Sequence, residues 1–375
     1  MKPRIYLDNN ATTFLDPRVW EAMALILQNP LGNPSSIHSF GQEAKALLNK
    51  ARRSIATYLQ VKPSELIFTS GGTESLSTIL QGFINQIPGH VITSSVEHAC
   101  VYSTAKALEA QGTPVTFLEP GAWGAITPDA VQQSIRPNTT LIALTAVNNE
   151  TGVKTDIAAI AAIAKEARIS FVVDGVCLLG KEQFTIPAGV MAIGFSGHKL
   201  HAPTGSGLSF VRSTAVMKPL LIGGEQESGR RGGTENLAAI VGLATAIDLL
   251  NSELPAATLH MQKLRDLLEQ SLLKHLPGVA VNGLGPRIGN TTNLSFDGIE
   301  GEVLLARLDM EGVAVSHGSA CASGALEPSR VLLNMGLPRE KAKTALRISL
   351  SRFTTEVEIL QAIDIICHLV TKLRG

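Results

Sequence analysis

The chain is poor in aromatic residues and in cysteine. Phe, Tyr and Trp make up 4% of its 375 residues, and only four cysteines occur, far apart in the sequence. None of the four belongs to a CxxC pair, so we expect neither a zinc site nor a disulfide framework. Such cysteine usage suits a reducing compartment, and we expect a cytoplasmic protein.

An excess of charge is also absent, because 32 Lys and Arg balance 32 Asp and Glu. Bulk charge therefore favours neither a nucleic acid nor a membrane as a partner. The basic residues gather only locally, in a pattern typical of a solvated helix face with one functional arginine; a docking patch is the alternative. They are Arg339, Lys341, Lys343, Arg347 and Arg352.

No apolar run in the sequence reaches the length expected of a membrane span. The richest run, residues 238–250, contains Thr245 and Asp248, and the first residues lack an apolar signal region. Hydrophobic residues nevertheless make up 45% of the chain, enough for a large core. The length suggests two domains.

What the sequence does contain is a regular alternation of apolar strands with helices. This pattern predicts a mostly parallel sheet covered by helices on both faces. The strands are expected at 65–69, 91–94, 115–118, 141–146, 171–174, 192–195 and 207–211, and the helices at 19–27, 41–59, 102–111, 128–134 and 157–167.

The last third of the chain has a mixed α+β pattern. A helix is expected over 235–250, and Pro255 indicates a boundary before a second helix over 257–275. Short strands follow at 278–281, 292–295 and 345–350. We therefore predict a large α/β domain of residues 15–254 and a smaller α+β domain that includes 255–375.

Lys199 follows an apolar strand, in a loop that Gly197 and Pro203 tighten. A lysine desolvated there would have a lowered pKa and a free amine for Schiff-base chemistry. A single loop lysine is more often solvated. Asp174 favours the chemical interpretation, because it ends another apolar strand and pyridoxal phosphate (PLP) enzymes place a carboxylate against the pyridine nitrogen.

Other polar residues also fall at the predicted carboxyl ends of strands, where such sheets bind ligands. His98 and Asn149 do so, as do Gly72 and Thr73. The latter pair stands between a strand and a helix start, where backbone N–H groups and the helix dipole favour a phosphate. A Gly-Gly pair alone more often marks only a turn between two secondary-structure elements.

Together these motifs resemble the long-loop group of cysteine desulfurases, within the class V aminotransferase superfamily of PLP fold type I. The matching segments run from residue 6 to about 356 and are Tyr6–Thr13, Gly32–His38, Thr69–Glu74, Val147–Glu150, Gly233–Asn236, Ser319–Cys321 and Arg352–Thr355. The resemblance implies a seven-stranded sheet in the large domain. It also implies that residues 1–14 join the small domain, which carries the catalytic cysteine loop.

The resemblance implies PLP bound on Lys199, with Asp174 at the ring nitrogen and His98 stacked on the ring and moving protons. Asn149 would lie near the cofactor O3′ and the substrate carboxylate. Arg347 would pair bidentately with the carboxylate of L-cysteine; its alternative is a surface arginine on a half-buried strand. The implied phosphate ligands are Gly72, Thr73, Ser196 and His198, with Thr234 supplied by the partner subunit of a homodimer.

Cys321 stands among small residues between Gly318 and Gly324. A cysteine in such a loop can become a reactive thiolate. The resemblance implies that Cys321 takes the substrate sulfur as a persulfide while L-alanine leaves. It would then pass the sulfur to an iron–sulfur scaffold or a tRNA-thiolation relay. No metal site is expected, apart from Cys321 as a transient iron–sulfur ligand. Cys100 and Cys367 are predicted to be structural.

One residue departs from the family pattern. Cys177 stands where the family usually has a glutamine that donates to O3′ of the cofactor, and a thiol is a poor donor. Two alternatives therefore stay open: another class V enzyme, such as a selenocysteine lyase or an aminotransferase, or a low-activity binding or regulatory protein with this fold. The Cys321 loop argues against an aminotransferase. Retention of the other site residues argues against a regulatory protein.

Overall fold

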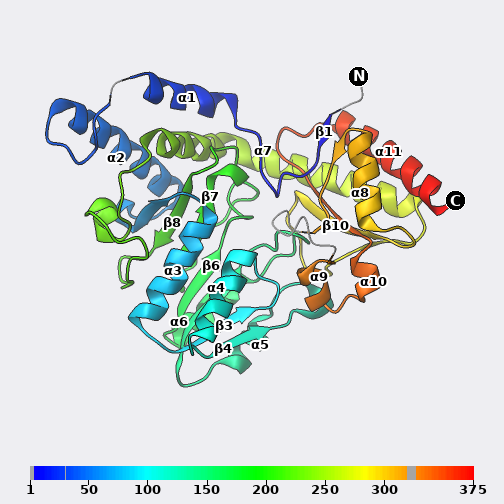
Figure 1. The fold of residues 1–375 in the computed structure, drawn as a ribbon, viewed down its shortest axis with the longest axis horizontal. Helices are drawn as coiled ribbons and strands as arrows, with labels where there is room; N and C mark the ends of the chain where they lie inside the picture. Colours follow the sequence, from blue (N-terminus) through cyan, green and yellow to red (C-terminus); the bar gives the residue numbers. More distant parts are fainter. Residues whose placement is uncertain (1–3, 30, 319–326) are drawn as a thin grey trace.

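The computed structural model describes residues 4–29, 31–318 and 327–375. It contains two main sheets with separate cores, joined by one long helix (Figure 1). The larger sheet has seven strands in the order β2-β8-β7-β6-β5-β3-β4. Their bounds are β2 Leu66–Thr69, β3 His90–Ser94, β4 Val115–Leu118, β5 Thr139–Thr145, β6 Ser170–Asp174, β7 Val190–Ser196 and β8 Gly207–Val211.

Strands β4, β3, β5, β6 and β7 pair in parallel, whereas β8 and β2 add to the edge antiparallel. The strands are apolar on both faces because helices cover both. On one face, Val172 packs with α3 (Gly72–Gln86) and α4 (Ala99–Ala110); on the other, Val173 belongs to the core under α6 (Ile157–Glu166) and α2 (Ser39–Leu59). The predicted fold class is confirmed.

The smaller sheet consists of three antiparallel strands, β12 (Ala345–Ser349), β10 (Thr291–Phe296) and β9 (Val279–Val281). Helices α8 (Gly301–Met310) and α11 (Glu356–Arg374) pack on it. Near it the chain start, β1 (Ile5–Tyr6), pairs in parallel with β11 (Val313–Ala314). The first residues are thereby attached to the C-terminal part of the protein; the domain bounds themselves stay a prediction. Four shorter helices are α1 Pro17–Gln28, α5 Pro128–Ser134, α9 Arg330–Asn334 and α10 Arg339–Ala342.

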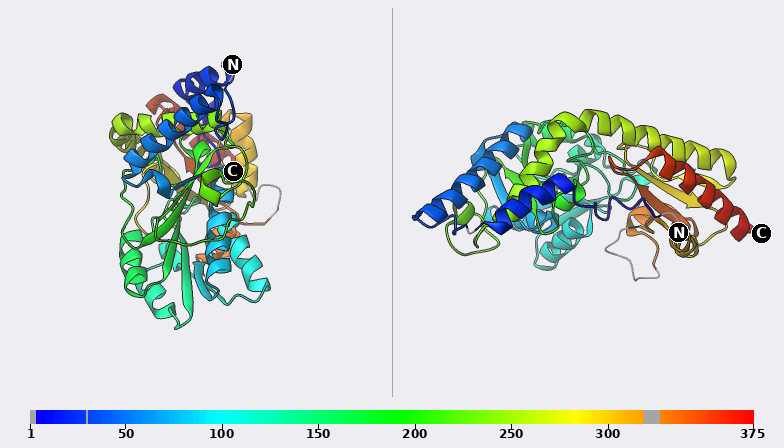
Figure 2. Two further views of the ribbon diagram at one scale, coloured as in Figure 1. Left: turned by 90° about the vertical axis from the view of Figure 1, so that its left-hand side faces the viewer. Right: turned by 90° about the horizontal axis from the view of Figure 1, so that it is seen from above.

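The helix α7 (Leu237–His275) is continuous through Pro255, so the predicted boundary between two helices at this proline is wrong (Figure 2). A proline inside a helix removes one hydrogen bond and costs about 3 kcal/mol. Burial outweighs that cost, because Leu250 and Leu254 lie in the core of the large sheet, while Leu264 and Leu268 lie in the core of the small one.

The expectation that no segment is long and apolar enough for a membrane span also needs correction. Among the described residues α7 meets that criterion by length and composition alone. Over its most apolar stretch, 56% of the residues are buried inside the protein. Its apolar composition is therefore explained by its position between α1, α2 and α11.

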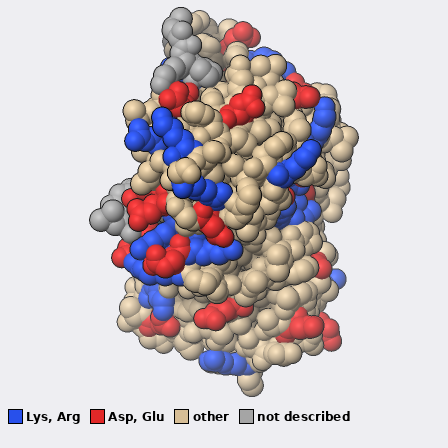
Figure 3. Space-filling model, turned by 90° about the vertical axis from the view of Figure 1, so that its right-hand side faces the viewer, with Lys and Arg blue, Asp and Glu red and all other residues tan. Residues whose placement is uncertain are grey.

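The predicted basic cluster is not a continuous surface patch. Arg347 is buried and the side chain of Arg352 is only 8% exposed, whereas Arg339 forms an ion pair with Glu327. On the end of the molecule that carries the small sheet, basic and acidic side chains lie side by side (Figure 3). The pattern on this face does not favour an anionic partner.

Candidate active site

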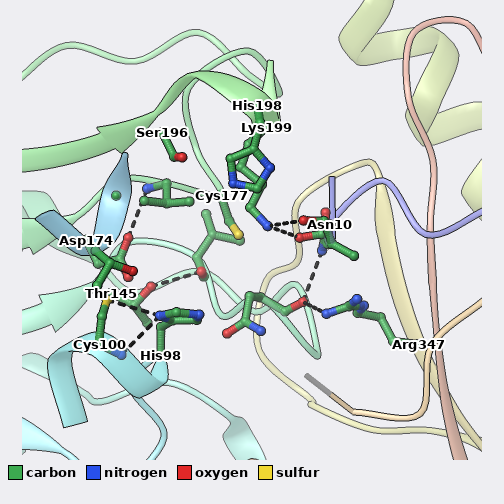
Figure 4. Close-up of a pocket in the computed structure, with 16 residues that line it drawn as sticks. Asn10, His98, Cys100, Thr145, Asp174, Cys177, Ser196, His198, Lys199 and Arg347 are labelled. Atoms are coloured by element: carbon green, nitrogen blue, oxygen red, sulfur yellow. Dashed lines mark hydrogen bonds between the residues drawn. The ribbon is translucent and has the colours of Figure 1, made fainter. Parts of the chain in front are cut away.

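A cavity of about 160 Å³ lies at the carboxyl ends of the parallel strands, where the two sheets approach each other (Figure 4). It brings together all but two of the residues predicted for the site. Thr234 lines a different hollow, and Cys321 falls outside the described residues. The predicted residues that line the cavity are Gly72, Thr73, His98, Asn149, Asp174, Cys177, Ser196, His198, Lys199 and Arg347.

Lys199 ends the short 3-10 helix that follows β7. Its Nζ donates hydrogen bonds to the backbone carbonyls of Asn10 and Ala11, the latter at 2.8 Å. The N-terminal segment therefore crosses the cavity beside the lysine, as Figure 4 shows. Two carbonyls around an amine fix its direction, and they hold Nζ inside the cavity.

Asp174 is buried at the end of β6, and its Oδ1 accepts a hydrogen bond of 2.9 Å from the Val176 N–H. Burial raises the pKa of this carboxyl, while His98 and the Val176 N–H act in the opposite direction. A buried carboxylate is stable when a cation lies against it. The position thus fits the protonated ring nitrogen of PLP.

His98 caps α4 with its own ring: Nδ1 accepts the Cys100 N–H at 3.2 Å. The Cys100 Sγ lies 3.0 Å from the same Nδ1. Because Nδ1 serves as an acceptor, the proton of the neutral ring is on Nε2. Burial lowers the pKa of His98, which favours that neutral form.

The N-terminus of α3 faces the cavity at Gly72 and Thr73. A Cβ on Gly72 would lie 2.7 Å from Val176 Cγ2, so no side chain fits between the helix and the loop after β6. The first-turn N–H groups of a helix attract an anion. Ser196 and His198 line the same cavity, and burial lowers the pKa of His198 to about 4, so its ring is neutral at pH 7. This end fits the phosphate of PLP.

Arg347 enters the cavity from β12 of the small sheet and is 1% exposed. Its Nη2 donates to Asp8 Oδ1 at 2.6 Å, and its Nη1 to the Asn149 carbonyl at 3.3 Å. Its Nε is buried and has no hydrogen-bond partner among the described residues. The surface-arginine alternative is therefore wrong, and the guanidinium keeps donor capacity for a further anion.

Cys177 follows β6 and is 8% exposed, at the edge of the cavity. Burial raises the pKa of its thiol, so Cys177 is neutral at pH 7. The substitution for glutamine thus places a weak donor beside the cofactor position; its effect on the cofactor stays a prediction.

Sequence reasoning missed three neighbours of the site. Cys100, predicted to be structural, lines the cavity and contacts His98. Asn10 and Asp8 belong to a segment whose route across the cavity depends on the pairing of β1 with β11. The available signal was the position of Cys100 two residues after His98, just before the helix expected from residue 102.

A family model described as aminotransferase class-V matches residues 5–361. The chain belongs to this family. Full-length relatives agree: a cysteine desulfurase of Nostoc sp. is 42% identical over 99% of this chain and 94% of its own length. The cysteine desulfurase IscS of Methanosarcina thermophila is 40% identical, over 99% and 93% respectively.

Solved structures in the family have the same fold. A NifS-like protein superimposes with a TM-score of 0.92 at 34% identity, covering 99% of this chain and all of its own. SspA in complex with cysteine gives a TM-score of 0.83 at 32% identity, covering 94% and 100%. The resemblance inferred from the motifs is confirmed over the whole chain.

Proposed function

We propose that the protein is a PLP-dependent cysteine desulfurase that converts L-cysteine to L-alanine and retains the sulfur as a persulfide on Cys321. The observation that carries this proposal is one cavity with an anion site at each end. Gly72 at the start of α3 forms one end, and Arg347, whose Nε has no partner in the part of the chain that the structure describes, forms the other. Asp174, His98 and Lys199 lie between them. Full-length relatives named as cysteine desulfurases support the same activity.

The cavity residues fit PLP at three points. The phosphate would lie against Gly72, Thr73 and Ser196, and the ring nitrogen against Asp174. When bound, PLP supplies an electron sink for the substrate Cα. Lys199 would provide the amine that holds the cofactor aldehyde. Chemical reduction of the loaded protein, followed by mass mapping of the modified peptide, tests this assignment.

The protein's own groups then orient the substrate and move protons. Arg347 binds the substrate carboxylate through charge-assisted hydrogen bonds. His98, with its proton on Nε2 and its Nδ1 fixed by the Cys100 N–H, offers a proton to the cavity. Lys199, held at the cavity wall, is the group placed to receive the Cα proton once its amine is released.

Cys321, which lies outside the described residues, is the proposed nucleophile. Its thiolate attacks the substrate sulfur, the substrate C–S bond breaks, and the carbon product takes up a proton to give L-alanine. Burial raises the pKa of both Cys100 and Cys177, which makes these cavity thiols poor nucleophiles. This contrast favours Cys321. An iron–sulfur scaffold or a thiolation relay would accept the persulfide sulfur.

A homodimer is part of the proposal. Large apolar side chains are exposed over α1, residues 37–40 and residues 216–222, and exposed apolar surface of this kind is typical of a protein–protein interface. They are Trp20, Leu25, Leu27, Ile37, Phe40, Val216 and Ile222. Thr234 is exposed and away from its own chain's cavity, as a residue that serves a partner's cofactor would be.

The decisive assay incubates the cofactor-loaded protein with L-cysteine and a thiol reductant, without any keto acid. We expect equimolar L-alanine and sulfide, and loss of both in Lys199→Ala. Cys321→Ser should still bind PLP but release no sulfide. Alanine formation only with added keto acid would identify an aminotransferase instead. Turnover of L-selenocysteine without turnover of L-cysteine would identify a selenocysteine lyase.

A further inference from the structure

Asp8 lies beside the arginine that we assign to the substrate, and the fold positions it there. Its backbone forms a parallel bridge with Ser349, two residues after Arg347 on the same strand. The next residue, Asn9, donates from both its backbone N–H and its side-chain amide to the Ser349 carbonyl, at 3.1 and 2.9 Å. The register of this bridge brings the Asp8 carboxylate to the guanidinium.

The contacts around Arg347 divide its donors. Asp8 Oδ1 accepts from Nη2 at 2.6 Å, and the Asn149 carbonyl accepts from Nη1 at 3.3 Å. Asn10 donates to the same Asn149 carbonyl at 3.1 Å, so the segment that carries Asp8 is fixed on both sides of the arginine. Nε remains without a partner among the described residues. A substrate carboxylate would therefore share the guanidinium with Asp8.

Two carboxylates on one guanidinium repel each other. Arg347 is 1% exposed and the Asp8 side chain 17% exposed, so water screens this repulsion only in part. Without a counter-charge, a buried arginine would bind any amino-acid carboxylate tightly. The substrate and the product carry the same α-carboxylate, so the arginine would bind both of them tightly. Binding both equally tightly slows product release without accelerating the chemical step.

We infer that Asp8 is a positioning residue that fixes the direction of the Arg347 guanidinium and weakens its hold on carboxylates, so that the amino-acid product leaves. The inference rests on the proposed function, because it takes Arg347 as the group that binds the substrate carboxylate. The Asp8 side chain thus has two effects: its hydrogen bond orients the guanidinium, and its charge weakens the binding of a second carboxylate.

Asp8→Asn separates them, because the amide oxygen still accepts from Nη2 while the charge is gone. Isothermal titration of the cofactor-loaded protein with L-alanine measures carboxylate affinity without turnover, and L-alaninamide serves as the ligand without a carboxylate. We expect Asp8→Asn to bind L-alanine about tenfold more tightly than wild type. We also expect a lower KM for L-cysteine and stronger inhibition by L-alanine.

Two further variants complete the design. Asp8→Ala removes the acceptor as well as the charge, and we expect it to bind L-alanine several-fold more weakly than Asp8→Asn. Glu302→Gln, an exposed acid on α8, makes the same change of net charge and should leave the L-alanine affinity as in wild type. Affinity for L-alaninamide should be similar in wild type and Asp8→Asn.

Two results would overturn the inference, and they can be told apart. If wild type prefers L-alanine to L-alaninamide but Asp8→Asn binds L-alanine no more tightly than wild type, Asp8 does not moderate Arg347. If wild type binds L-alanine and L-alaninamide equally, Arg347 does not bind the carboxylate, and both the substrate assignment and the inference fail.

Discussion

Cys177 shows how a single side chain can tune this site. A glutamine amide at this position would donate a hydrogen bond to the cofactor O3′, whereas the buried thiol donates weakly. A net hydrogen bond is worth about 0.5–1.5 kcal/mol, and about 1.4 kcal/mol corresponds to one pKa unit. We expect the pH titration of the bound cofactor's absorbance to differ by up to about one unit between wild type and Cys177→Gln.

The absorbance titration of both proteins, with desulfurase rates measured alongside, tests this. Superimposable curves and equal rates would mean that Cys177 is a neutral packing substitution.

Cys100 acts on the site through His98. Its backbone N–H donates to Nδ1, and its Sγ lies 3.0 Å from the same atom. With the ring proton on Nε2, we assign the thiol as a second donor to Nδ1, which stabilises the neutral ring and lowers the pKa of His98. Cys100→Ala removes the thiol donor, so the pKa of His98 should rise, by about half a unit for a weak donor. Titration of the His98 ring by NMR measures the change.

Cys100→Ser is the matched control for this experiment, because it keeps a hydroxyl donor and should hold the pKa of His98 near or below its wild-type value. An unchanged His98 titration in Cys100→Ala would contradict the assignment of the thiol as a donor.

At the scale of elements, the predictions succeeded where capping and apolar pattern agree. The helix Pro128–Ser134 begins after Thr127, whose side chain accepts from the Ala130 N–H, and its bounds match the expectation. The positions of Asp174 and Lys199 were also predictable from local sequence, because each follows an apolar run that forms a strand. Asp8 was not, because its contact with Arg347 depends on a bridge between residues more than 300 positions apart.

Pro255 was misjudged because the energy that keeps α7 continuous comes from the two cores on either side of it. We expect Pro255→Ala to raise the thermal midpoint, because the exposed ring loses no packing and the helix gains a hydrogen bond. The greater entropy of the unfolded chain offsets part of this gain, which leaves a net stabilisation of about 1–2 kcal/mol.

Thermal unfolding followed by circular dichroism measures the effect. Ser252→Ala, an exposed substitution one turn earlier on α7, is the control and should change stability by no more than about 0.5 kcal/mol. A midpoint that falls in Pro255→Ala would show that the proline ring is a native packing element.

At the scale of the whole molecule, Asp16 joins parts of the protein that belong to different cores. Its carboxylate caps α1 and accepts from Arg18 at 2.8 Å and from Arg352, which follows β12 of the small sheet. Removing one partner of a buried ion pair costs about 3 kcal/mol or more. We expect Asp16→Asn to lower stability by about that amount at pH 7.

The pH dependence of this effect has a definite sign. Hydrogen bonds from Arg18 and then Arg352 hold the pKa of Asp16 far below its usual range. Its contribution is therefore complete above the unfolded-state pKa of about 4 and is lost as the pH falls below it. Thermal midpoints of wild type and Asp16→Asn should differ at pH 7 and converge in acid, whereas Asp309→Asn, an exposed acid, should follow wild type throughout. A constant difference down to pH 2 would contradict the assignment.

The continuity of α7 has a consequence for how the site selects its substrate. A helix of 39 residues is about 58 Å long, and it resists bending because its leucines are buried in both sheets. The small sheet cannot swing about Pro255 without exposing those leucines. Arg347 and Lys199 are thus held at a nearly constant spacing. In the proposed function, that spacing lets the fold itself select substrates by the distance between their carboxylate and their amine.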